Sequence, residues 1–191
     1  MSLRRAIAVV ALANLAYFGV EFTVAARIGS VSLFADSVDF LEDASVNTLI
    51  LVGLSWSARA RAKLGMGLAL LILVPAIGTL WAVATKIASP IAPAPTPLTL
   101  AGLGALVVNL GCAYLLAGFR SHGGSLTRAA FLSARNDALA NIGIIGAGLV
   151  TATTLSIWPD LIVGLAIAAM NIEAAREVFS VARNEHGEAA P

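Results

Sequence analysis

Apolar residues dominate six stretches of the chain, and polar or helix-breaking segments separate them. The stretches cover residues 6–26, 31–55, 64–86, 97–119, 129–153 and 158–180. Each is long enough to cross a bilayer as a helix, which takes about 20 apolar residues. The pattern predicts an all-α fold, a six-helix transmembrane bundle in residues 1–180, followed by a short cytoplasmic tail in residues 181–191.

The connections between these stretches are short. Residues 89–97 contain four prolines and are expected to form a stiff extended loop, because proline lacks an amide hydrogen and restricts the residue before it. Threading six spans leaves Arg27 and Lys86 on one side of the membrane and most other basic residues on the opposite side. These are Arg4, Arg5, Arg59, Arg61, Lys63, Arg120, Arg128, Arg176 and Arg183. Basic loops stay in the cytoplasm, so both termini are predicted to be cytoplasmic.

The composition supports a membrane protein and excludes several other classes. Hydrophobic residues make up 59% of the 191 residues and charged residues 12%, and the mean hydropathy is +0.89. Six spans leave no room for a soluble domain of useful size. The net charge of +1 does not indicate a surface that binds nucleic acid. The single cysteine, Cys112, excludes an intrachain disulfide and a cysteine-rich metal site.

Carboxylates are concentrated in the second apolar stretch. Four of them lie within a few helical turns: Asp36, Asp39, Glu42 and Asp43. A charged group near the bilayer centre costs roughly 3 kcal/mol even on the permissive insertion scale, so these acids need solvation, pairing or a function. At about 100° per residue, three of the acids and Asn47 share one helix face, and Glu42 lies at its edge.

The fifth stretch carries a second set of oxygen ligands. Ser133 and Asp137 are four residues apart and share a helix face, and Asn136 and Asn141 lie nearby. Together with Asp39 and Asp43, this pair could form a four-ligand cage for a divalent cation. Oxygen ligands suit Mg²⁺ and Mn²⁺, whereas the absence of intramembrane histidine makes zinc less indicated.

A structural role is the competing interpretation for some of these residues. Asp36 and Glu42 could lie near helix ends at the membrane surface, and asparagine and serine commonly join packed helices by hydrogen bonds. Asp36, Asn47, Asn136 and Asn141 are therefore expected only to assist a metal site. The functional interpretation is favoured for Asp39, Asp43 and Asp137, because three deep acids and the one nearby Arg135 cannot all be satisfied as structure.

Residues 29–43, with the sequence GSVSLFADSVDFLED, resemble the second-span signature of the cation diffusion facilitators. In that family, paired ligands four residues apart occur in the second and fifth spans, and they correspond here to Asp39, Asp43, Ser133 and Asp137. Trp158, Pro159 and Asp160 also resemble the opening of the family's sixth helix. The resemblance covers nearly the whole chain.

The resemblance implies a transporter, not an enzyme, that exports a divalent metal from the cytoplasm in exchange for protons. It further implies a homodimer in the plasma (inner) membrane, without a prosthetic group; the cargo could be Mn, Fe, Zn, Co or Cd. Two features depart from the family. Ser133 stands where the family has His or Asp, and only a short tail stands where members carry a cytoplasmic metal-binding domain.

Two other functions fit parts of the pattern. The carboxylates could hold Mg²⁺ in an intramembrane lipid phosphotransferase, although the longer Asp-Gly signature of such enzymes is absent from the sequence. The small size would also suit a non-transporting membrane subunit.

Overall fold

A computed structural model of the chain describes residues 2–53, 77–119 and 124–188. Five long helices and one shorter helix make up most of these residues, and none of them lies in a strand. The all-α fold and the six-helix bundle are therefore confirmed. The helices are α1 (Leu3–Ile28), α2 (Val31–Gly53), the short helix Ile77–Ala88, α4 (Pro95–Ala117), α5 (Gly124–Thr154) and α6 (Trp158–Glu188).

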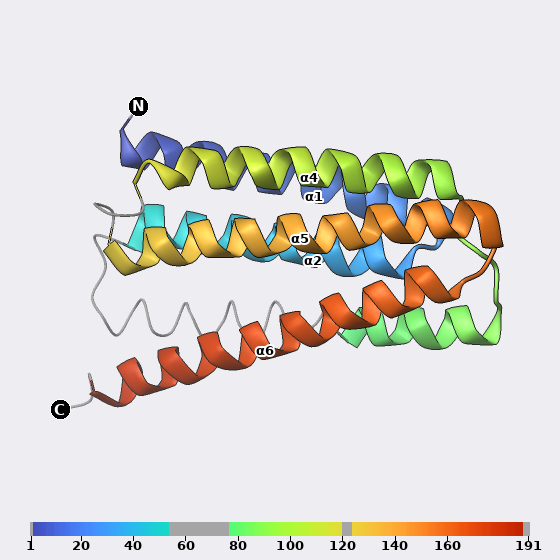
Figure 1. Ribbon diagram of the computed structural model, residues 1–191. Coiled ribbons are helices and arrows are strands. Elements are labelled where there is room, and N and C mark those ends of the chain that lie inside the picture. Colours follow the sequence, from blue (N-terminus) through green and yellow to red (C-terminus); the bar gives the residue numbers. More distant parts are fainter. Residues whose placement is uncertain (1, 54–76, 120–123, 189–191) are drawn as a thin grey trace.

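The helices run along a common direction, and α2 occupies the interior (Figure 1). It contacts α1, α4, α5 and α6, so its polar side chains face protein rather than lipid. The outside of the bundle is apolar: Leu12 on α1, Val107 on α4 and Ile162 on α6 are each more than 60% exposed. Polar groups inside and apolar groups outside are the arrangement expected of helices surrounded by lipid.

The length and composition of α1, α4 and the Ala134–Thr154 part of α5 are sufficient for membrane spans. The start of α1 and the end of α6 lie at the same end of the bundle (Figure 1). Most of the expected third span, residues 64–86, falls outside the described residues, and the helix Ile77–Ala88 covers only its end. The exact limits of the six spans stay a prediction.

A tight turn joins α1 to α2. Gly29 ends α1 with φ 62° and ψ 39°, a left-handed conformation that glycine adopts without a steric penalty. The two helices then run antiparallel, and the rings of Tyr17 and Phe40 meet at a centroid distance of 5.0 Å. This contact indicates how the two antiparallel helices are aligned. A residue of α1 lies opposite a residue of α2 when their two numbers add up to about 57, as 17 and 40 do.

Part of the proline-rich connection is helical, so the expectation of an extended loop over residues 89–97 was wrong for its last residues. Residues 89–94 are not helical, but α4 begins at Pro95 and includes Pro97. The first turn of a helix tolerates proline because its amides have no partner within the helix. At the other end of the chain, α6 continues to Glu188, through most of the segment assigned to a tail.

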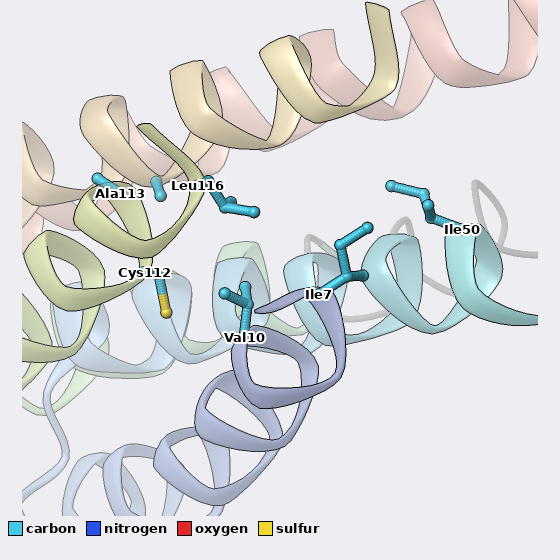
Figure 2. Packing of buried hydrophobic residues seen from close by; sticks show 7 residues of the cluster. Ile7, Val10, Ile50, Cys112, Ala113 and Leu116 are labelled. Carbon is cyan, nitrogen blue, oxygen red and sulfur yellow. The ribbon is translucent and has the colours of Figure 1, made fainter. Parts of the chain in front are cut away.

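An apolar cluster closes the end of the bundle where α1 begins. Figure 2 shows Ile7 and Val10 of α1 near Ile50 of α2 and near Cys112 and Leu116 of α4. All five side chains are at most 6% exposed. This cluster separates the polar interior described below from the end of the bundle that carries Arg4 and Arg5.

Candidate functional site

Three of the predicted ligands lie near each other in the interior, and we call Asp39, Asp43 and Asp137 the central acid group. Asp137 of α5 acts electrostatically on Asp39 of α2, as do the neighbouring acids of α2. The thiol of Cys112 on α4 lies within electrostatic range of both Asp43 and Asp137. The side chain of Asp43 is 7% exposed, whereas those of Asp39 and Asp137 are half-buried.

The three carboxylates of the central acid group do not surround one position for a metal ion. Within the described residues, no three His, Cys, Asp or Glu side chains are close enough together to hold one metal ion. The fourth predicted ligand, Ser133, belongs to α5, but its side chain lies outside the described residues.

The predicted accessory residues divide into two groups. Asn136 is exposed on α5, and the Nδ2 of Asn47 donates a hydrogen bond of 2.8 Å to the backbone oxygen of Asp43, one turn earlier in α2. Asp36 and Asn141 instead bind each other, since Asn141 Nδ2 donates to Asp36 Oδ2 at 2.6 Å.

Arg135 is exposed and forms no ion pair with Glu42, although the structure describes both residues.

Asn109 of α4 extends the contact between Asp36 and Asn141. Its Nδ2 donates to Asn141 Oδ1 at 3.0 Å, which links α4, α5 and α2 by two consecutive hydrogen bonds. All three side chains are at most 2% exposed. The sequence interpretation missed Asn109. An amide in the middle of an otherwise apolar fourth span was the available signal, because such residues usually have a polar partner inside the protein.

The first helix contributes two buried polar residues to this interior. Glu21 lies beside Asp36, and Asn14 falls opposite Asp43 in the register set by Tyr17 and Phe40. Glu21 and Asn14 are fully buried. Neither side chain has a hydrogen-bond partner within the described part of the chain. The interior thus has two polar levels, one at Asp43 and one at Asp36.

Asp160 occupies a third position, at the first turn of α6. Its Oδ2 accepts a hydrogen bond from the amide of Val31 at 2.8 Å. Its Oδ1 accepts from the hydroxyls of Ser30 and Ser32 at 2.7 and 2.6 Å and from the amide of Ser32 at 3.1 Å. A carboxylate at a helix N-terminus satisfies amides that have no partner within the helix. Asp160 therefore holds the start of α2 against α6.

Residues 7–184 match the cation efflux transmembrane domain, which covers nearly the whole chain. No curated protein sequence matches the chain. The family match and the apolar helices indicate an integral membrane protein that transports metal cations. The chain belongs to the cation efflux family, whose members are transporters rather than enzymes.

Proposed function

We propose that the chain exports a divalent cation from the cytoplasm in exchange for protons, and that the central acid group binds the cation during transport. The observation that supports this best is the electrostatic contact of Asp39 with Asp137, because it joins the acidic faces of α2 and α5. Carboxylates of two helices supply the hard oxygen ligands that cations such as Mn²⁺ prefer. Ser133 would complete the set as the weakest ligand.

Exchange with protons follows from the chemistry of these ligands. A carboxylate binds a metal ion only after it has lost its proton, so metal and proton compete for the same group. Protons that enter from the far side would release the cation there. Metal binding and protonation therefore alternate at the central acid group in the proposed cycle.

The direction of export depends on the orientation of the chain. Basic residues such as Arg4 and Arg5 are exposed at the start of α1. At the opposite end, the Nζ of Lys86 donates a hydrogen bond to the backbone oxygen of Gly29. This asymmetry supports cytoplasmic termini, and we propose the plasma membrane as the location. We further propose that the transporter works as a homodimer.

Uptake into proteoliposomes with an imposed pH gradient tests the transport mechanism. Mn²⁺, Zn²⁺, Fe²⁺, Co²⁺ and Cd²⁺ would be compared, and we expect a pH gradient to accelerate uptake of at least one of them. Asp43→Ala should reduce that uptake at least tenfold because it removes a ligand, while the helices still insert.

The matched control is Glu173→Ala, which removes an exposed acid on α6 and should leave uptake unchanged. Equal uptake by Asp43→Ala and the native chain would contradict the assignment of the site. Uptake that does not respond to the pH gradient would contradict proton exchange but leave the metal site standing.

A further inference from the structure

Two fully buried carboxylates, Glu21 on α1 and Asp36 on α2, face each other outside the central acid group. Apart from the facing carboxyl group, with which a proton can be shared, the two oxygens of Glu21 and Oδ1 of Asp36 have no hydrogen-bond partner within the described residues. Burying an unpaired charge costs several kcal/mol per ion, so these adjacent acids need either a shared proton or a bound cation between them.

No basic side chain of the described segments supplies that charge. The two basic residues at this end of the bundle are engaged elsewhere or lie outside. Lys86 donates to the backbone oxygen of Gly29, and Arg27 is exposed. Neither Glu21 nor Asp36 forms an ion pair within the described residues. Two ways to neutralise the pair remain, a proton shared between the two carboxyl groups and a bound cation that takes its place.

The hydrogen bonds around Asp36 orient its carboxylate for such a role. Asn141 donates to Oδ2 at 2.6 Å, and Asn109 in turn donates to Asn141 at 3.0 Å. These bonds occupy one oxygen of Asp36 and leave Oδ1 open beside Glu21. Metal-binding carboxylates are commonly held in this way, by partners that fix their orientation without touching the metal.

We propose that Glu21 and Asp36 form a second binding site for a divalent cation, with three open carboxylate oxygens as ligands. Asp36 lies seven positions before Asp43 in α2, which is about 10 Å along the helix at 1.5 Å per residue, and three positions before Asp39. It lies nearer the turn at Gly29, on the side opposite Arg4 and Arg5. The transported cation would occupy this second site just before its release, and this role rests on the proposed function. The ability of the site to bind a cation does not depend on that function.

Binding of Mn²⁺ to the purified full-length chain in nanodiscs tests the second site. Equilibrium dialysis should give two Mn²⁺ ions per native chain, and one each for Glu21→Gln and Asp43→Asn. Electron paramagnetic resonance should show dipolar broadening between two nearby Mn²⁺ ions in the native chain but not in Glu21→Gln or Asp43→Asn. Glu173→Gln, an exposed isosteric control, should keep both ions and the broadening.

A second variant keeps the proposal testable if Glu21→Gln fails to fold. Asn109→Ala retains both carboxylates but removes the bond that orients Asn141, and it should weaken one of the two Mn²⁺ affinities roughly 10–100-fold. Two ions with unchanged affinities in Asn109→Ala would overturn the proposal, as would a Glu21→Gln chain that binds as much Mn²⁺ as the native one. If Asp43→Asn keeps every ion while Glu21→Gln loses one, the central site fails and the second site stands.

Discussion

Asp160 differs from Glu21 and Asp36 because hydrogen-bond donors surround both of its carboxylate oxygens. Two hydroxyls and two backbone amides surround its carboxylate, whereas Glu21 and Asp36 face each other and retain open oxygens. The same residue type therefore serves two purposes within one bundle. A carboxylate saturated by donors stabilises the fold, and a carboxylate with open oxygens is available for a cation.

The structural role of Asp160 can be tested by Asp160→Asn. The substitution keeps the shape but turns one acceptor oxygen into a donor, which then faces a backbone amide or a hydroxyl at the start of α2. Leaving a buried donor unsatisfied costs about 1–3 kcal/mol, so the melting temperature in detergent should fall clearly. Thr153→Ala is the control, because Thr153 is exposed and bonds only within its own helix. Equal melting temperatures for both variants would show that Asp160 does not hold the start of α2 against α6.

At the scale of elements, α2 and α6 are held together by backbone proximity as well as by Asp160. A Cβ atom added at Gly164 of α6 would lie 2.8 Å from Val31 Cγ1 and 2.9 Å from the backbone nitrogen of Ser32. The helices can approach this closely only because Gly164 has no side chain, a common device in membrane helix packing. The position of α6 against the first turn of α2 depends on this contact.

Gly164→Ala should therefore destabilise the bundle by about 1–3 kcal/mol, the usual cost of overpacking a tight contact. Gly146→Ala is the matched control, since nothing lies within 4 Å of the added atom on α5 and alanine favours a helix. Thermal unfolding of both variants in the same detergent measures the difference. A Gly164→Ala chain as stable as Gly146→Ala would mean that the two helices can separate at no cost.

At the scale of the whole molecule, the bundle combines an apolar outside with a polar interior arranged in levels. One end carries Arg4 and Arg5 together with the cluster around Ile7 and Ile50. The other end carries the turn at Gly29 and the non-helical residues 89–94. The proposed direction of transport depends on which end faces the cytoplasm.

Cysteine labelling tests this orientation. The chain has one natural cysteine, and Cys112 is buried, so an introduced exposed cysteine should dominate the signal. Intact cells treated with a membrane-impermeant maleimide should label Ser89→Cys but not Ser2→Cys, and opened cells should label both. Both positions are exposed at opposite ends of the bundle. Labelling of Ser2→Cys in intact cells would reverse the orientation and the direction of export.

Much of the fold could be read from the pattern of apolar stretches. Hydrophobic length predicts transmembrane helices because unpaired backbone groups are costly in lipid, and this cost does not depend on tertiary contacts. The helical start at Pro95 was missed because the rule against proline applies to helix interiors and not to first turns. The expected metal ligands also follow from the sequence as candidates, since intramembrane acids are rare without a function.

The sequence by itself determined the class of protein, the helical bundle and the concentration of acids in the second and fifth spans, because these follow from residue types and spacing along one chain. Only the tertiary structure decided which polar residues meet. Residues of different helices meet in the bonds from Asn109 through Asn141 to Asp36, in the pairing of Glu21 with Asp36, and in the bond from Ser32 to Asp160. Helix periodicity indicates which residues share a face, but the packing of the helices determines what each face contacts.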